Sequence, residues 1–236
     1  MKLKGQVALV TGGGRGIGRA TCLALAREGA DIIATARSQD ELEAVREEVE
    51  SMGSNSLAIQ ADISKESDVI SMVCESTKQF GRIDILVNNA GVAVRKPLIE
   101  TSAGEFDNVM GVNVRGLFLC TKHTLPHMLR KGQGKVINIS SGAGKTGIGG
   151  LSVYSASKFA VIGLTESLAQ EVSGTIGVYA VCPGSVDTGM YRSLYNDEPS
   201  LKPEDVAAKI VELCLPGSKV PSGSCVTIYG RVEGRV

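Results

Sequence analysis

Several features that would tie this chain to a particular kind of partner are absent from its sequence. The 25 Lys and Arg residues balance the 25 Asp and Glu residues, so no overall basic field exists to attract nucleic acid or an anionic membrane. No apolar stretch approaches the length of a membrane span, and the first apolar run is too short for a signal peptide. We therefore expect a neutral or mildly charged small-molecule partner, with no nucleic acid and no membrane.

Cysteine is present but lacks the arrangements that would make it structural. The six cysteines contain no CxxC pair, and their density is far below that of a disulfide scaffold. They lie mostly among apolar neighbours, at positions 22, 74, 120, 182, 214 and 225. This pattern is typical of buried, reduced thiols, so we expect a soluble cytoplasmic protein.

The chain also lacks the marks of a divided or repetitive protein. No linker, low-complexity tract or solenoid-like repeat interrupts its 236 residues. A hydrophobic content of 43% is enough for one full core. We expect one domain over residues 1–236, with two small domains as the less favoured division.

What the sequence does contain is a regular alternation of two patterns. Short apolar, β-branched runs occupy residues 7–10, 31–36, 57–60, 83–87, 135–139, 177–182 and 225–229. Longer segments with helical spacing lie between them, for example at 16–28, 39–51 and 64–80. Strands that read as continuous apolar runs are buried on both faces, so we predict a Rossmann-type α/β fold, a doubly wound parallel β-sheet flanked by helices on both faces. The least regular segment, 186–200, is the candidate substrate loop and mobile lid.

A glycine-rich turn follows the first predicted strand, at residues 11–18. It does not match the common G-x-G-x-x-G pattern, but Gly12, Gly16 and Gly18 provide a wider turn with the same physical roles. Backbone amides at the start of the next helix can there face a diphosphate. The alternative is a loop that merely turns; its place directly after a buried strand favours phosphate binding.

The end of the second predicted strand indicates which nucleotide is bound. A carboxylate is expected there if the protein binds the ribose 2'-hydroxyl of NAD, but the chain reads Thr35-Ala36-Arg37. Arg37 and Arg15 can both approach a 2'-phosphate, although either could instead be a solvated surface residue. We predict that NADP(H) is the cofactor, with NAD(H) less favoured.

A tyrosine and a lysine stand four residues apart, as Tyr154 and Lys158. On a helix they share one face, so the Lys158 charge favours the ionised form of the tyrosine. An isolated pair of this kind is usually a solvated helix face. Here an Asn-Asn-Ala-Gly run follows the fourth apolar segment and Ser140-Ser141 end the fifth, which favours proton transfer by Tyr154.

Together these motifs resemble those of the single-domain short-chain dehydrogenases/reductases, and the similarity extends over nearly the whole chain. The motifs that carry it are Thr11-Gly12-x-x-x-Gly16-x-Gly18, Asp62, Asn88-Asn89-Ala90-Gly91, Asn113, Ser141, Tyr154-x-x-x-Lys158 and Pro183-Gly184-x-Val186-x-Thr188. The glycine spacing differs from that of the extended sugar-nucleotide epimerases. Within the family, the chain resembles the 3-oxoacyl carrier-protein reductases.

The resemblance implies four catalytic residues. Tyr154 would exchange a proton with the substrate oxygen, and Ser141 would orient that oxygen; the family spacing selects Ser141, since local sequence does not distinguish it from Ser140. Lys158 would lower the pKa of the tyrosine and bind the nicotinamide ribose. Asn113 would position a water in a proton relay, or simply satisfy neighbouring backbone groups.

The resemblance also implies the cofactor contacts. These are Gly12, Arg15, Gly16, Ile17, Gly18, Arg37, Asp62, Ile63, Asn89, Ala90, Gly91, Tyr154, Lys158, Pro183, Gly184, Val186 and Thr188. Asp62 would accept a hydrogen bond from the adenine amino group, or alternatively cap the helix that is expected to begin near Ser64. Most of these positions fall at predicted carboxyl ends of strands, where open α/β sheets bind ligands.

Two other features suggest sites that we do not favour. His123 and His127 have the spacing of helical zinc ligands, but Pro126 intervenes and no Glu completes a metalloprotease motif, so we predict no metal. Arg130, Lys131 and Lys135 could dock an acidic carrier protein, but a solvated helix end is simpler.

The chain departs from the family in three places. It reads Ile176-Gly177-Val178-Tyr179 where relatives commonly read Ile-Arg-Val-Asn, the preceding loop 171–175 looks shortened, and the usual Gly-Gly near the C-terminus is Gly230-Arg231. The catalytic set is untouched. These changes bear on oligomer contacts near the C-terminus and on assignment to the carrier-protein reductases.

The predicted function is therefore NADP(H)-dependent interconversion of a ketone and a secondary alcohol, with carbonyl reduction as the favoured direction. More specific alternatives are a 3-oxoacyl carrier-protein reductase and a sugar or polyol dehydrogenase. A different class is a non-catalytic NADP-binding regulatory protein. As a family member, the chain is expected to form a homodimer or homotetramer.

Overall fold

The computed structural model describes residues 1–172 and 174–229, and in them seven strands form one sheet in the order β3-β2-β1-β4-β5-β6-β7. Every neighbouring pair is parallel. The strands are β1 (Val7–Thr11), β2 (Asp31–Ala36), β3 (Ser56–Gln60), β4 (Ile85–Asn88), β5 (Gly134–Ile139), β6 (Ile176–Pro183) and β7 (Cys225–Ile228). The predicted doubly wound parallel sheet is confirmed.

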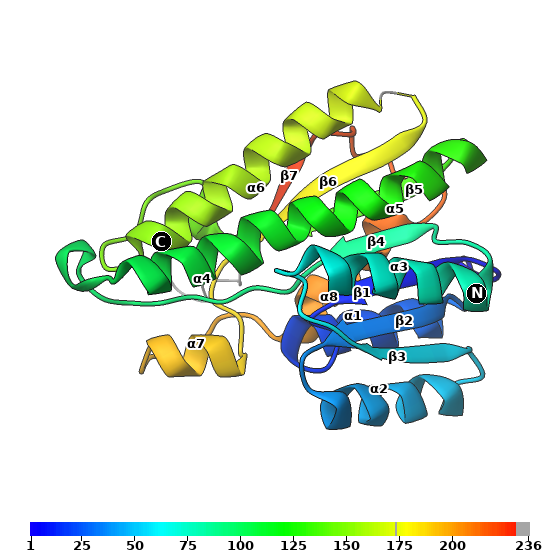
Figure 1. Cartoon of the computed structure of the whole chain (residues 1–236), viewed down its shortest axis with the longest axis horizontal. Coiled ribbons are helices and arrows are strands. Elements are labelled where there is room, and N and C mark those ends of the chain that lie inside the picture. Colours follow the sequence, from blue (N-terminus) through cyan, green and yellow to red (C-terminus); the bar gives the residue numbers. More distant parts are fainter. Residues whose placement is uncertain (173, 230–236) are drawn as a thin grey trace, which may run out of the picture.

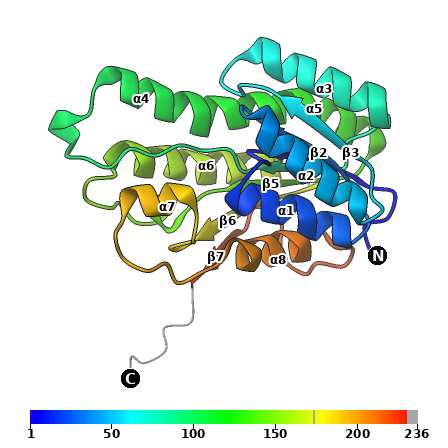
Figure 2. The same cartoon turned by 90° about the horizontal axis from the view of Figure 1, so that it is seen from below.

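Helices cover both faces of this sheet (Figures 1 and 2). The longer ones are α1 (Gly16–Arg27), α2 (Gln39–Ser51), α3 (Glu66–Phe80), α4 (Ala103–Met110), α5 (Leu117–Lys131), α6 (Ser152–Glu171) and α8 (Pro203–Cys214). Shorter elements are the 3-10 turns η1 (Leu98–Glu100) and η3 (Gly142–Gly144), the π-helical turn η2 (Gly111–Gly116) and α7 (Gly189–Leu194). Residues of α1, α2 and α8 pack in one core, and residues of α3, α5 and α6 in the other.

Strand β1 shows why the apolar runs form the centre of the sheet. Its alternate side chains enter opposite cores: Ala8 and Val10 face the α1 side, whereas Val7 and Leu9 face the α3 side. All four are at most 3% exposed. A strand buried on both faces needs apolar residues at every position, which is the pattern that the sequence displays.

The order of strands reverses beside β1, because the chain passes from β1 outward to β3 and then returns to place β4 on the other side of β1. The carboxyl ends of β1 and β4 thus lie at a topological switch point, where sheets of this kind bind ligands. In both views α7 stands at this end of the molecule, opposite the N-terminus (Figures 1 and 2).

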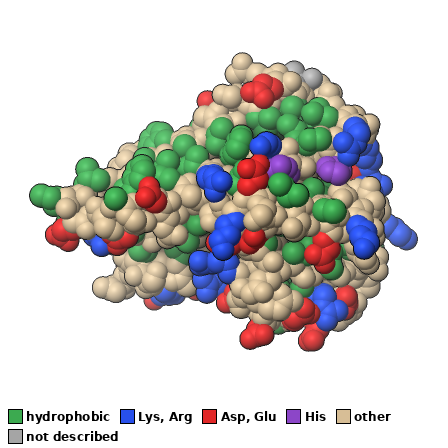
Figure 3. Space-filling model, viewed as in Figure 1, with side chains coloured by type: hydrophobic (Ala, Val, Ile, Leu, Met, Phe, Trp, Pro, Cys, Tyr) green, Lys and Arg blue, Asp and Glu red, His purple; other side chains and the backbone are tan. Residues whose placement is uncertain are grey.

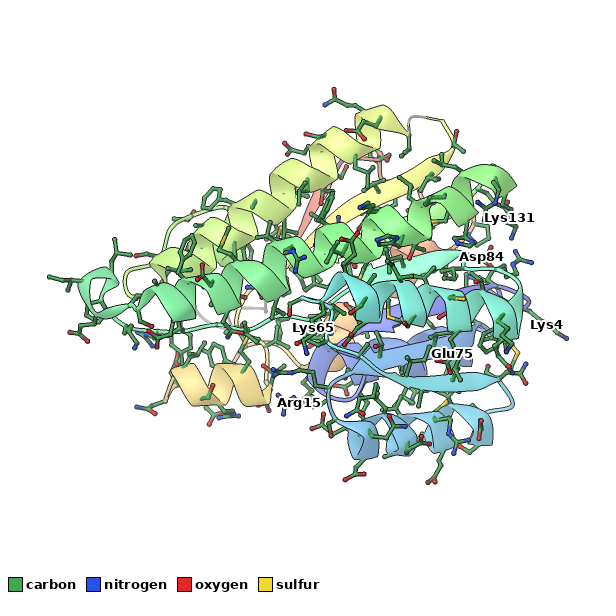
Figure 4. The ribbon with its side chains drawn as sticks, in the orientation of Figure 1. Lys4, Arg15, Lys65, Glu75, Asp84 and Lys131 are labelled. Carbon is green, nitrogen blue, oxygen red and sulfur yellow. The ribbon has the colours of Figure 1, made fainter. Side chains whose placement is uncertain are left out.

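At the opposite end of the central strands, where β4 begins, Asp84 is the centre of a cluster of ion pairs (Figure 4). Its buried carboxylate accepts hydrogen bonds from Val7 N at 2.9 Å, from Arg82 Nε at 2.7 Å and from Lys131 Nζ at 2.5 Å. These hydrogen bonds hold Asp84 in the turn that precedes β4. The strand therefore begins at Ile85 rather than at the predicted residue 83.

The departure at residues 176–179 has a steric explanation. Gly177 lies so close to the Tyr179 hydroxyl that a Cβ there would stand 2.8 Å from it and 2.9 Å from Lys135 Nζ. Lys135 Nζ donates to the Tyr179 hydroxyl at 3.3 Å. The glycine therefore makes room for the tyrosine and lysine pair. Of the two other departures, Gly230-Arg231 lies outside the described residues, and so does one residue of the loop 171–175.

Candidate active site

Helix α6 carries the predicted tyrosine and lysine in its first two turns. Tyr154 is the third residue of the helix, and Lys158 follows it by one turn. Lys158 is only 4% exposed; its Nζ donates to the Ile139 carbonyl at 2.8 Å and lies 5.6 Å from the centroid of the Tyr154 ring. The two side chains therefore share one face of the helix beside the end of β5, with Lys158 buried and Tyr154 half-buried.

The two serines at the end of β5 have different roles. The Ser140 hydroxyl donates to the Lys158 carbonyl at 2.9 Å and is buried, so it ties β5 to α6. The Ser141 hydroxyl accepts from Ala143 N at 3.1 Å and also hydrogen bonds to Tyr154. Of the two, Ser141 is the serine that meets the tyrosine.

Burial controls the proton affinity of both helix residues. It raises the pKa of Tyr154 to about 12, and the Ser141 hydrogen bond opposes this rise only in part. Burial also lowers the pKa of Lys158 to about 8. Desolvation of the phenolate is the largest influence on the Tyr154 pKa in this structure, so this pKa lies above its ordinary value. That the Lys158 ammonium lowers it stays a prediction.

Asn113 lies in the π-helical turn η2, and its side chain is fully engaged. Its Nδ2 donates to the Val92 carbonyl at 2.9 Å and to Ser157 Oγ at 3.0 Å, while Oδ1 accepts from Val92 N at 2.8 Å. The side chain thus satisfies neighbouring backbone, which is the alternative that the sequence left open. It joins the segment after β4 to helix α6.

Gly91 is the point at which three elements converge. A Cβ on this residue would stand 3.3 Å from Asn113 Oδ1 and 3.5 Å from Lys158 Nζ. Side chains from the π-helical turn and from α6 therefore both contact the segment after β4 at Gly91. A larger side chain at Gly91 would separate Lys158 from Asn113.

The glycine-rich turn between β1 and α1 uses each of its three key glycines differently. Gly12 and Gly16 adopt left-handed backbone conformations, with φ of 64° and 53°. Gly18 faces the turn itself, and a Cβ there would stand 2.0 Å from the Gly12 carbonyl oxygen. Only glycine permits this close packing of the helix on the turn.

The start of α1 fits a diphosphate. Arg15 is the N-cap residue, no side chain caps the helix, and its first turn holds no acidic residue. The amides of the first turn, which includes Ile17, therefore have no side-chain acceptor and carry the positive end of the helix dipole. This is the arrangement by which nucleotide-binding turns hold an anion.

Thr11 belongs to the glycine-rich motif, but its role is visible only in the structure. Its hydroxyl accepts hydrogen bonds from Asn89 N at 3.0 Å and from Ala90 N at 3.1 Å. Asn89 Nδ2 in turn donates to the carbonyls of Thr11 and Gly12, at 2.9 and 3.1 Å. The glycine-rich turn and the segment after β4 are thus fixed to each other across the switch point.

Arg15 and Arg37 both lie exposed at the carboxyl edge of the sheet, and Arg15 is labelled in Figure 4. The Arg15 side chain is 80% exposed and its Nη1 lies 3.5 Å from Glu41 Oε1. An exposed pair at this distance contributes little to stability. Both guanidinium groups are therefore free to turn toward an anion bound near the end of β2.

Asp62 and Ile63 follow β3. Asp62 Oδ1 accepts from Ser64 N at 3.0 Å and from Ser64 Oγ at 2.7 Å, which forms a local turn. Helix α3 begins at Glu66, and its N-cap Lys65 makes no side-chain cap, so Asp62 is not the helix cap. The buried Ile63 packs against Gly116 of the π-helical turn.

The loop after β6 leads from the end of that strand into the predicted lid. Gly184 N donates to the Ile228 carbonyl at 2.9 Å, and Val186 pairs with Leu201. Thr188 caps α7 by accepting from Tyr191 N at 3.2 Å. Its methyl group lies 3.3 Å from the Cβ position of Gly16. Thr188 thus brings the start of α7 against the glycine-rich turn.

The disfavoured sites are engaged in local contacts. His123 Nε2 lies 2.9 Å from Glu66 Oε1, and His127 Nδ1 lies 2.9 Å from Arg130 Nη2. Within residues 1–172 and 174–229, no group of three His, Cys, Asp or Glu residues is placed to bind a metal ion. In the same part of the chain, no helix has both the length and the apolar character needed to span a bilayer.

Comparison with known proteins places this geometry in a family. The family model of the short chain dehydrogenases matches residues 6–199. A 3-oxoacyl-[acyl-carrier-protein] reductase of Synechocystis sp. is 39% identical over 240 residues, which covers 97% of this chain and 97% of the relative. The corresponding protein of Staphylococcus epidermidis is 42% identical over 192 residues, covering 80% of this chain and 79% of its own.

Solved structures agree with this relationship. The crystal structure of a 3-ketoacyl-(acyl-carrier-protein) reductase from Brucella melitensis complexed with NADH matches with a TM-score of 0.91 and 32% identity, over 97% of this chain and 98% of the other. The structure of levodione reductase matches with a TM-score of 0.90 and 33% identity, covering 96% of each chain.

Proposed function

The chain belongs to the short-chain dehydrogenases and is an oxidoreductase that interconverts a ketone and an alcohol, and we propose that it works as a carbonyl reductase that prefers NADPH. The observation that carries the proposed direction is the group of half-buried Ser141 and Tyr154 with buried Lys158 at the carboxyl ends of the strands. Because burial raises the pKa of Tyr154 to about 12, its phenol keeps its proton at neutral pH. A protonated phenol is the form that reduction requires.

Each residue of the site has a separate role in carbonyl reduction. A bound nicotinamide cofactor supplies the hydride. Tyr154 donates its proton to the carbonyl oxygen of the substrate, and Ser141 donates a hydrogen bond to the same oxygen. The Lys158 ammonium stabilises the negative charge that develops on the tyrosine. Asn113 fixes the segment that carries Gly91 against α6.

The preference for NADPH is supported by charge at the end of β2. Arg37 and Arg15 present two exposed guanidinium groups there, and Ala36 leaves the position of the ribose-binding carboxylate without an acid. A phosphate is bound well by two such groups. The Brucella structure is described as complexed with NADH, so NADH is the competitor against which this proposal has to be measured.

A non-catalytic NADP-binding protein is the competing class. The buried ammonium of Lys158 argues against it, since burial lowers its pKa to about 8 and so opposes its charge. A buried charge of this kind costs stability, and binding of a regulatory nucleotide gives no reason to combine it with Ser141 and Tyr154. Turnover with cofactor and substrate separates the two classes.

The proposal extends to assembly and compartment. Hydrophobic side chains gather over α4, α5 and α6 (Figure 3), where Phe106, Phe118 and Phe159 are 46%, 47% and 47% exposed. Exposed apolar surface of this kind supports a homo-oligomer, a dimer or tetramer. All six cysteines are free thiols in the structure, which supports a reducing compartment, the cytoplasm.

The test is NADPH and NADH oxidation over a panel of 3-oxoacyl thioesters, diketones, sugars and quinones. We expect oxidation of NADPH with at least one carbonyl compound, and a kcat/KM for NADPH above that for NADH. Fast reaction with 3-oxoacyl thioesters would identify the carrier-protein reductase variant, and preference for a ketose would identify the sugar variant. Tight cofactor binding without turnover of any carbonyl would instead favour the regulatory class.

A further inference from the structure

The lid, residues 186–200, is held in one conformation by its own contacts. Arg192 donates from Nε to Asp187 Oδ1 at 2.8 Å and from Nη2 to Glu198 Oε2 at 3.0 Å. The Tyr191 hydroxyl donates to Asp197 Oδ2 at 3.0 Å. The helix α7 and the turn after it therefore form one unit, whose contacts with the rest of the chain decide where it sits.

The ring of Tyr195, the first residue after α7, is contacted by two side chains. Its ring stacks on that of Tyr191, with centroids 4.8 Å apart and planes inclined by 18°. On the other side, Arg95 Cζ lies 4.1 Å from the Tyr195 centroid, and Arg95 Nη1 donates to the Leu194 carbonyl at 2.8 Å. Arg95, in the segment after β4, thus contacts the lid twice, through the Tyr195 ring and through the Leu194 carbonyl.

The same segment also contacts the loop that leads into α6. Lys96 N donates to the Gly150 carbonyl at 2.9 Å, and the Cβ position of Gly150 is 3.7 Å from Arg95 Cγ. Gly150 immediately precedes the turn that starts the helix of Tyr154. Arg95 therefore lies between the lid on one side and the start of the catalytic helix on the other.

Arg95 thus links Tyr195 to the loop that starts the helix of Tyr154. The half-buried rings of Tyr191 and Tyr195 give this part of the lid a flat apolar surface. Tyr195 is therefore placed to meet a substrate that lies between the lid and this helix.

We propose that Tyr195 contacts the substrate and selects for carbonyl compounds with a flat or apolar substituent, and that Arg95 is the positioning residue that holds Tyr195 beside Tyr154. The inference rests on the proposed function, reduction of a carbonyl at Tyr154. Phenol rings supply a large apolar area and stack with other flat groups at preferred geometries. The surface thus favours diketones or oxoacyl compounds over sugars.

The experiment compares KM and kcat of five variants with three probes: 1,4-cyclohexanedione, the N-acetylcysteamine thioester of 3-oxobutanoate, and D-fructose. Arg95→Met and Tyr195→Ala should each raise KM for the dione or the thioester by about five- to thirtyfold, the range expected for a cation–aromatic contact that excludes water. The kcat at saturation and the Kd for NADPH should stay within about twofold of the parent, because neither residue touches the transferred proton.

Two further variants separate positioning from a general structural effect. Tyr195→Phe keeps the ring and should keep the parent KM. Lys122→Met is the matched control, since Lys122 Nζ lies 5.9 Å from the Phe118 ring on α5, a cation–aromatic pair distant from the lid in sequence. It should leave KM unchanged. The double variant Arg95→Met/Tyr195→Ala should be no worse than Tyr195→Ala alone, because Arg95 acts through Tyr195.

The outcomes distinguish the inference from the function on which it rests. A parent that reduces the dione or the thioester, with an unchanged KM in Arg95→Met, overturns the positioning role. It is also overturned if the double variant raises KM by the product of the two single effects. A lower KM for fructose than for both other probes overturns the substrate class. A parent that reduces none of the three overturns the inference together with carbonyl reduction.

Discussion

Lys158 Nζ donates its hydrogen bond to the Ile139 carbonyl and lies 5.6 Å from the ring centroid of Tyr154. The ammonium is therefore held in place by the end of β5. It is close enough to Tyr154 for its positive charge to stabilise negative charge on the tyrosine. Its effect on catalysis is electrostatic, and it disappears when the lysine loses its proton.

This relationship predicts a pH profile. Burial lowers the pKa of Lys158 to about 8, whereas Tyr154, with a pKa raised to about 12, stays protonated well above that pH. As pH rises through 8, the site loses the positive charge but keeps the proton donor, so kcat/KM for reduction should fall. Lys158→Met should be slower at neutral pH and show no fall in this range. A parent profile that is flat from pH 7 to 9.5 would contradict the assignment.

Tyr154→Phe removes the proton donor and little else. The kcat for carbonyl reduction should fall by about 10² to 10⁴-fold, the usual contribution of general acid catalysis. The Kd for NADPH, measured by titration, should barely change. Tyr179→Phe is the matched control, because this buried tyrosine bonds to Lys135 and not to the catalytic set. A loss below tenfold for Tyr154→Phe would remove the tyrosine from the mechanism.

Arg37→Ala should weaken NADPH binding and leave NADH binding nearly unchanged. A hydrogen bond to a charged group contributes roughly 1.5 to 3 kcal/mol, so the selective loss should be about ten- to a hundredfold in Kd. Arg27→Ala, which removes an exposed arginine from the last turn of α1, serves as the control for net charge.

Gly18→Ala tests the packing of the glycine-rich turn. The new Cβ would stand 2.0 Å from the Gly12 carbonyl oxygen, which belongs to backbone and has little room to move. Overpacking of this kind lowers the free energy of unfolding by about 1 to 3 kcal/mol or more, and urea denaturation measures it. Gly104→Ala in α4 meets nothing within 4 Å, so it should be neutral or stabilising by up to about 1 kcal/mol. Similar midpoints for the two variants would refute the packing argument.

Much of the fold could be predicted because its signals are local. The apolar runs located the seven strands of the described residues, and the central strands, such as β1 and β4, are buried on both faces and so must be apolar throughout. Boundaries shifted where side chains intervene: Asp84 delays β4, and α3 begins at Glu66 because Asp62 first forms a turn with Ser64. The lid was expected to be irregular, yet Thr188 caps a helix within it.

The site was predictable to a lesser degree. Tyr154 and Lys158 have a fixed helical spacing, so their proximity could be read from the sequence. The direction of the tyrosine pKa could not, because it depends on how much water the folded site excludes. Arg95 carried no signal at all, since its partner Tyr195 lies far away in the chain and only the fold brings them together.

The hydrogen bonds between Thr11 and the Asn89-Ala90 segment also bear on the order of events during synthesis. Strands β1, β2 and β3 can pair as soon as they leave the ribosome, since they are neighbours in both sequence and sheet. The nucleotide site cannot form at that stage, because its second wall arrives only when β4 inserts beside β1, after two intervening strands have been made. A nascent chain that ends before Asn89 should therefore leave the glycine-rich turn without its partner wall, and cofactor should protect only chains elongated beyond that residue.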